Sequence, residues 1–119
     1  MEYNLEKRTR EFSKTILRLL KHLKINELNR NIISQLIKSA TSVGANYCET
    51  NAASSKKDFT NKIFICRKEI QETKYWIEML GEVEEKFKTQ LRTIWQEAHK
   101  LTLIFNKISS SARGGKLSH

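Results

Sequence analysis

The chain has 119 residues, contains no proline and only four glycines, and carries a formal net charge of +9 at pH 7. This length suits a single domain with a real hydrophobic core, and the abundance of Lys, Glu, Leu, Ile and Asn favours long helices with short links. The sequence shows neither an apolar signal region at its start nor an apolar run long enough to cross a membrane. We therefore expect a cytoplasmic location without membrane contact, and the basic excess favours a polyanionic partner.

The first predicted helix covers residues 5–24, where apolar side chains recur on one face at helical spacing. The opposite face carries a stripe of basic residues in which Glu11 is the only acid. The members of this basic stripe are Lys7, Arg10, Lys14, Arg18 and Lys21. Because cations at this spacing suit a row of phosphates, the basic stripe is the candidate nucleic-acid site. A solvated face that only keeps the protein soluble is the alternative.

A second helix is predicted over about residues 27–52, with Asn26 as its N-cap. Its apolar positions cover about half of the helix circumference, whereas a helix that contacts one core needs a stripe of only about 100°. This wide arc consists of Ile32, Ile33, Leu36, Ile37, Ala40, Val43, Gly44 and Tyr47. We interpret the excess as burial on two sides, against the helix's own bundle and against another subunit. Tight packing within a single bundle is the alternative.

The segment KSATSVGANYCET, residues 38–50, is composed largely of small side chains. Gly44 lies in the middle of it, although glycine inside a helix costs roughly 1 kcal/mol relative to alanine. Such a glycine usually has a packing reason, commonly the close approach of another backbone. The candidate oligomer interface therefore consists of Ala40, Val43, Gly44, Ala45 and Tyr47.

The remaining chain predicts two further helices. Ser55 and Asp58 have capping-box spacing and are expected to start the third helix, and Gly81 is expected to end it. Apolar residues then recur at spacings of three and four in both segments, as in the packing of antiparallel bundles. The sequence thus predicts an all-α fold, an antiparallel up-down-up-down four-helix bundle over residues 1–109.

Residues 110–119 are expected to form a flexible basic tail, because their serines and glycines cannot bury apolar surface. Arg113 and Lys116 flank glycines and could reach a phosphate that the rigid helices miss. A frayed, solvated end without a role is the alternative.

The sequence contains no recognisable catalytic, metal or cofactor motif. None of the three histidines follows a glutamate by three residues, as di-iron bundles require. Cys48 and Cys66 lack zinc-ligand spacing and are interpreted as reduced thiols. Glu69 and Glu72 fall on one helical side and could serve as paired acids, but salt bridges are the commoner role of such residues. We therefore expect no enzymatic activity, no catalytic residues, no metal and no cofactor.

Three aromatic residues lie away from the centre of the predicted core. Trp76 and Trp95 fall at the edges of their helices' apolar stripes, and Tyr75 points nearly away from its stripe. A core margin or an interface is the favoured interpretation for all three, and a stacking surface for a nucleobase is the alternative for Tyr75.

Three segments taken together resemble a bacterial four-helix-bundle family that is named for proteins encoded in intervening sequences of 23S rRNA genes. These are KSATSVGANYCET (38–50), SSKKDF (54–59) and KEIQETKYWIEML (68–80), and the resemblance covers about residues 5–108. It implies a barrel-like homopentamer of bundles. It also implies kinship with accessory proteins of diversity-generating retroelements, which are basic pentamers that bind reverse transcriptase and nucleic acid.

The leading hypothesis is a non-enzymatic homo-oligomer, a pentamer if the resemblance holds, that binds structured RNA or DNA through its basic surface. The alternative is a protein adaptor that scaffolds a reverse transcriptase or another protein. The first places the functional residues on the basic stripe, whereas the second requires no contact with phosphates.

Overall fold

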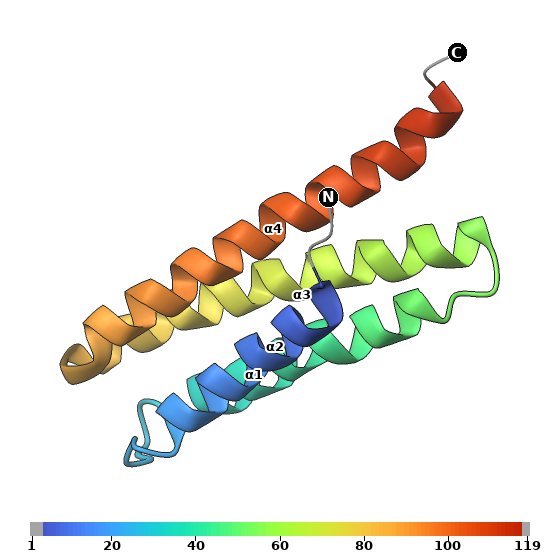
Figure 1. The fold of residues 1–119 in the computed structure, drawn as a ribbon. Coiled ribbons are helices and arrows are strands. Elements are labelled where there is room, and N and C mark those ends of the chain that lie inside the picture. The colour runs from blue at the N-terminus through green and yellow to red at the C-terminus, as the bar shows by residue number, and fades with distance from the viewer. Residues whose placement is uncertain (1–3, 118–119) are drawn as a thin grey trace.

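The computed structural model describes the backbone of residues 4–117 and the side chains of residues 4–111. The elements are α1 (Leu5–Leu20), α2 (Arg30–Asn51), α3 (Lys56–Val83), the short 3₁₀ helix η1 (Glu85–Phe87) and α4 (Lys88–Leu117). The four long helices lie side by side as an elongated bundle (Figure 1), and no strand occurs in the described residues. The predicted all-α four-helix bundle is therefore confirmed.

Along each pair of successive helices, the residue numbers rise on one helix while those of the contacting residues fall on the other. Thr9 on α1 lies against Gly44 on α2. One turn further along α1, the hydroxyl of Ser13 donates a hydrogen bond to the carbonyl of Ala40, one turn earlier on α2. Contacts from α2 to α3 and from α3 to α4 show the same reversed order. Each helix thus runs antiparallel to the helix before it.

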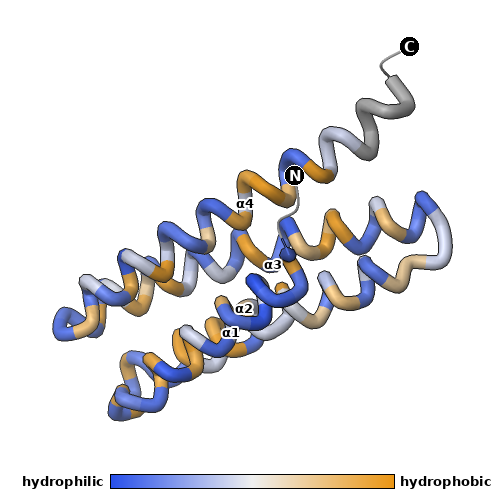
Figure 2. Tube along the Cα trace, in the orientation of Figure 1, coloured by the Kyte–Doolittle hydropathy of each residue, from blue (hydrophilic) through white to orange (hydrophobic). Residues whose placement is uncertain are grey.

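The core is built from the apolar faces that the sequence pattern predicts. Hydrophobic positions recur between hydrophilic ones along every helix (Figure 2). Leu36, Leu80, Leu101 and Phe105 come from three different helices and are completely buried. Full burial of such a side chain contributes about 1.5–3 kcal/mol to stability, so these buried side chains hold the bundle together. Because they fix which side of each helix faces the core, they also fix which side faces outward.

The start of α3 follows the predicted capping box with one change. The Ser55 hydroxyl accepts a hydrogen bond from the backbone N–H of Asp58 at 3.0 Å, as expected for an N-cap. The Asp58 carboxylate, however, accepts from the backbone N–H of Ser54 at 3.1 Å rather than from that of Ser55. Two N–H groups near the helix start are satisfied in this way.

Two predicted helix boundaries were wrong. Gly81 does not end α3, because the helix continues to Val83, which packs against the core, and the N–H of Glu84 still bonds to the carbonyl of Leu80. The second helix begins at Arg30 rather than at residue 27. The reason is a turn before it, in which the Asn26 side chain accepts from the backbone N–H groups of residues 28 and 29.

The fourth helix, α4, continues to Leu117, so its backbone includes most of the segment that we expected to form a flexible tail. The expected end of the bundle at residue 109 stays a prediction. Ser109 is still buried, whereas Ser110 and Ser111 are exposed. Arg113 and Lys116 lie beyond the described side chains, so a role for them stays a prediction.

Candidate nucleic-acid interface on the first helix

The basic stripe is a surface feature of α1. All five of its members, Lys7, Arg10, Lys14, Arg18 and Lys21, are exposed. The helix can present them because its opposite face, including Phe12 and Ile16, is buried in the core. Four of the five residues belong to α1 itself, and Lys21 is its C-cap. The sequence-predicted cations are thus brought together on one accessible face.

Two glutamates on the same helix reduce the positive charge of the stripe. Glu6 lies 3.8 Å from Arg10, and Glu11 lies 4.0 Å from Lys14 and 3.8 Å from Arg18. All of these side chains are about half exposed, and such surface ion pairs contribute at most about 1 kcal/mol. A phosphate can therefore compete for the three cations. Lys7 and Lys21 take part in no ion pair among the described side chains.

A groove of about 300 Å³ runs between the basic stripe and α2. Arg10 and Lys14 form part of its α1 side, and Thr41, Ala45 and Cys48 form part of its α2 side. The guanidinium of Arg10 lies 3.9 Å from the sulfur of Cys48. The groove places two of the candidate phosphate ligands beside the small residues of α2.

The candidate oligomer-interface residues lie mostly inside their own chain. Ala40 and Val43 are buried in the core at 1% and 0% exposure. Gly44 faces α1, where an added Cβ would lie 3.6 Å from the carbonyl oxygen of Thr9. The ring of Tyr47 packs on that of Phe105 with centroids 6.1 Å apart, and Ala45 is exposed.

Packing within the bundle accounts for the wide apolar arc of α2 except for Ile37, which is 37% exposed. The helix packs against both α1 and α3 and reaches α4 through Tyr47. The hydroxyl of Thr73 on α3 donates to that of Ser39 on α2 at 3.0 Å, because small residues let the two helices approach closely. Packing within one bundle, the alternative left open by the sequence, therefore suffices for four of the five residues. The surface that α2 leaves free runs along Ile37, Thr41 and Ala45.

The sequence analysis missed an ion pair that joins α1 to α4. The guanidinium of Arg8 bonds to both carboxylate oxygens of Glu97, with N···O distances of 2.8 and 3.1 Å. Both side chains are about one-third exposed. Their partnership depends on how α1 and α4 align, and no local pattern in the sequence encodes that alignment.

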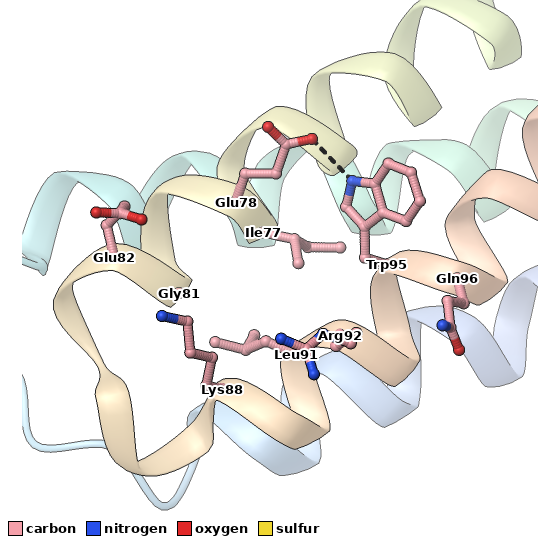
Figure 3. A pocket seen from close by; sticks show the side chains of 9 residues that line it. All are labelled: Ile77, Glu78, Gly81, Glu82, Lys88, Leu91, Arg92, Trp95 and Gln96. Carbon is pink, nitrogen blue, oxygen red and sulfur yellow. Dashed lines mark hydrogen bonds between the residues drawn. The ribbon is translucent and has the colours of Figure 1, made fainter.

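The aromatic residues at the core margin divide into two groups. Trp76 and Trp95 are half-buried and pack against the core, as the favoured interpretation predicted. Tyr75 is 51% exposed and meets Trp76 edge-on, with ring centroids 4.8 Å apart. A second and larger groove, between α3 and α4, is lined by Trp95 (Figure 3).

The other candidate groups considered in the sequence are the paired acids Glu69 and Glu72 and the cysteines. Glu69 and Glu72 form no ion pair among the described side chains, and burial, followed by repulsion from Glu72, raises the pKa of Glu69. Burial also raises the pKa of the Cys66 thiol to about 11. Within residues 4–111 no three His, Cys, Asp or Glu side chains gather as metal ligands. None of the described helices is long and apolar enough to cross a membrane.

The fold and the exposed cations define a basic, all-α helical-bundle protein. A model of the family described as 23S rRNA-intervening sequence protein matches residues 1–107. The chain therefore belongs to the 23S rRNA-intervening sequence protein family, and the resemblance found in the sequence is confirmed.

A search of the solved structures supports this assignment. The fold is similar to the crystal structure of a protein of unknown function from the S23 ribosomal protein family of Bacteroides thetaiotaomicron. The two chains are 30% identical with a TM-score of 0.77, and the match covers 87% of this chain and 96% of that chain. A search of curated proteins found no match.

Proposed function

We propose that this protein is a non-enzymatic, cytoplasmic nucleic-acid-binding protein that contacts the phosphates of structured RNA through the basic stripe on α1. The observation that carries the proposal is the exposure of five cations along one helix face of a chain with a net charge of +9. Such a linear cluster is the electrostatic footprint of a nucleic-acid-binding surface. The family's name, which refers to a 23S rRNA gene context, favours RNA over DNA as the ligand.

We further propose that the protein acts as a homo-oligomer, with the family resemblance favouring a pentamer. Of the predicted interface residues, Ala45 is exposed, and together with the neighbouring exposed residues Ile37 and Thr41 it forms a surface of α2 that is available to another subunit. A ring of subunits would present several copies of the basic stripe, and the copies would strengthen RNA binding through multivalency.

The salt dependence of RNA affinity tests the proposed phosphate contacts. If one stripe neutralises five phosphates, the logarithm of the association constant should fall with the logarithm of salt concentration with a slope of about −4. The double variant Lys14→Ala/Arg18→Ala should flatten this slope by about 1.5 and weaken binding similarly for different RNA sequences. Fluorescence anisotropy with a labelled hairpin RNA at several salt concentrations provides the measurement.

A matched control removes two other exposed cations. Lys100→Ala/Lys107→Ala changes the net charge equally but acts on α4, away from the stripe. An equal loss of affinity in both double variants would refute the stripe as a site and indicate a general effect of charge. Wild-type affinity independent of salt would overturn phosphate binding by the stripe and favour the alternative, a protein adaptor for a reverse transcriptase or another protein.

Light scattering tests the oligomer. Ala45→Arg introduces a large side chain at an exposed position and should reduce the measured mass without a loss of helical circular dichroism. Asn61→Arg, on the exposed side of α3, is the matched control and should leave the mass unchanged. A wild-type protein that is monomeric at all concentrations would contradict this part of the proposal.

A further inference from the structure

The groove between α3 and α4 has a volume of about 520 Å³ and is larger than the groove beside the basic stripe. It lies where the end of α3 faces the start of α4 (Figure 3). The buried residues Ile77 and Leu91 form part of its lining, and Trp95 forms one wall. A concave apolar site of this size, with a few polar groups at its edge, is typical of pockets for small ligands.

The indole of Trp95 is held in place by three neighbours. Its Nε1–H donates a hydrogen bond of 2.9 Å to the carboxylate of Glu78 (Figure 3). The ring of His99, one turn later on α4, stacks on it with an angle of 8° between the ring planes and centroids 5.3 Å apart. The ammonium of Lys74 lies 4.9 Å from the indole centroid. The indole of Trp95 is therefore preorganised for stacking against another flat ring.

Gly81 keeps the groove open. A Cβ added at this position would meet no heavy atom within 4 Å, and the residue lies inside α3 without a positive φ. Its backbone conformation therefore does not require glycine, although glycine costs the helix roughly 1 kcal/mol relative to alanine. The missing side chain instead leaves open space at the Gly81 end of the groove.

Charges of both signs surround the groove. Arg92 is exposed and forms no ion pair among the described side chains, and Lys88 lies 3.7 Å from Glu85. The carboxylate of Glu82, which also lines the groove, pairs with no described cation. The site can thus bind an anion through a guanidinium and accept hydrogen bonds through a carboxylate.

We propose that this groove binds an unpaired guanine nucleotide of RNA, with the base stacked on Trp95 and its phosphate at Arg92. A nucleotide complements the groove because it combines a flat ring with an anionic phosphate. Among the bases, guanine offers two adjacent N–H donors on its pairing edge, which suit the two oxygens of the Glu82 carboxylate. Adenine has one N–H₂ donor beside an acceptor on that edge, so it fits a carboxylate less well.

This inference rests on the proposed RNA binding but uses a different part of the molecule. The basic stripe on α1 contacts phosphates irrespective of sequence, whereas the α3–α4 groove reads one exposed base. Contacts to phosphates position a nucleic acid, and contacts to base edges give specificity. Together they would select structured RNA that carries an unpaired guanine.

Tryptophan fluorescence tests the groove directly. The variant Trp76→Phe leaves Trp95 as the only indole in the chain, so quenching reports stacking at this site. Titration with guanosine 5′-monophosphate should give saturable quenching, and adenosine 5′-monophosphate should bind at least tenfold more weakly because it leaves a carboxylate oxygen without a donor. Equal affinity for the two nucleotides, or no saturable quenching, would overturn the proposal.

Two further variants in the same background locate the binding. Gly81→Leu should fill the groove and abolish quenching, while its helical circular dichroism and melting temperature stay the same or rise. Arg92→Ala should weaken nucleotide binding about tenfold by removing the phosphate contact. Unchanged nucleotide affinity in a folded Gly81→Leu variant would refute the groove as the site.

The two proposals can fail separately. Lys14→Ala/Arg18→Ala should leave the binding of guanosine 5′-monophosphate unchanged but lower the affinity for RNA. If the nucleotide binds and RNA affinity is independent of salt, the stripe is refuted and the groove stands. If RNA binds with the expected salt slope and the nucleotide does not bind, the groove is refuted and the stripe stands.

Discussion

The side-chain amide of Asn29 donates a 2.7 Å hydrogen bond to the carboxylate of Glu84, 55 residues further along the chain. Asn29 is completely buried and precedes α2, whereas Glu84 follows α3. The same amide also donates to the carbonyl of Lys24, and its oxygen accepts from the backbone N–H of Asn26. This one side chain therefore connects the α1–α2 link with the α3–α4 link, which lie at the same end of the bundle (Figure 1).

Replacing Asn29 by alanine should destabilise the bundle. The substitution leaves the carbonyl of Lys24 and the half-buried carboxylate of Glu84 without this donor, and such a loss costs about 1–3 kcal/mol. Urea unfolding followed by circular dichroism measures the effect. Asn31→Ala, at an exposed position two residues later, is the control and should change stability by less than about 0.5 kcal/mol. Equal effects of the two substitutions would contradict the connecting role of Asn29.

Gly44 should respond very differently to a small and to a large substitution. The Cβ of alanine would lie 3.6 Å from the Thr9 carbonyl oxygen, an ordinary contact, so Gly44→Ala should stabilise the protein by up to about 1 kcal/mol through helix propensity. The side chain in Gly44→Leu would press against α1, and such overpacking costs about 1–3 kcal/mol.

Unfolding experiments and light scattering distinguish this outcome from the one expected from sequence. If Gly44 lay in an oligomer interface, as the sequence analysis proposed, Gly44→Leu would dissociate the oligomer and leave the helices intact. The contact with Thr9 instead predicts a loss of stability in the bundle itself. Gly81→Ala is the matched control, because its Cβ meets nothing and reports helix propensity alone. A fall in mass without a loss of stability would favour the original hypothesis.

The sequence was sufficient where the structural signal is periodic. Apolar spacing predicted the four helices, and it placed Lys14 and Arg18 on an exposed face because a buried face fixes the opposite one. It was insufficient where the outcome depends on how helices align. The same apolar arc on α2 fits contact with a second subunit or with three helices of one bundle, and periodicity alone could not reveal the contacts with Thr9 and Phe105.

The groove beside Gly81 also depends on how helices align, which the sequence pattern does not show. Glycine after an apolar run is a common helix stop, but here the packing of Val83 on the core extends α3 beyond it. The stacked pair of Trp95 and His99 joins residues one turn apart and could have been noticed in the sequence. The hydrogen bond from Trp95 to Glu78 could not, since it requires the register between α3 and α4.

Alkaline pH should destabilise the fold through Cys66. Its thiol has an ordinary pKa of 9.0 that burial raises to about 11 in the folded protein. Below pH 9 the folded and unfolded states both keep the proton, so Cys66 gives no pH dependence there. Between about pH 9 and 11 only the unfolded state releases it, so the free energy of unfolding should fall by up to about 1.4 kcal/mol per pH unit.

Urea unfolding at several pH values between 8 and 11 measures this slope, and comparison with a variant isolates the thiol. Cys66→Ala should show a shallower decline, because other titrating groups remain and only this thiol is removed. Cys48→Ala is the control, since Cys48 is only half-buried, and its slope should equal that of the wild type. Identical slopes in all three proteins would argue against a buried, protonated Cys66.

Removal of Glu11 should strengthen RNA binding. This carboxylate lies within 4.0 Å of both Lys14 and Arg18, so it competes with phosphates for two members of the basic stripe. Since a surface ion pair is worth about 0.2–1 kcal/mol, Glu11→Gln should raise the affinity about twofold to fivefold at low salt. Fluorescence anisotropy with the same hairpin RNA detects this gain. Glu72→Gln removes an equal charge from an exposed position on α3 and should have a smaller effect. An equal gain in both variants would show that net charge, and not the stripe, sets the affinity.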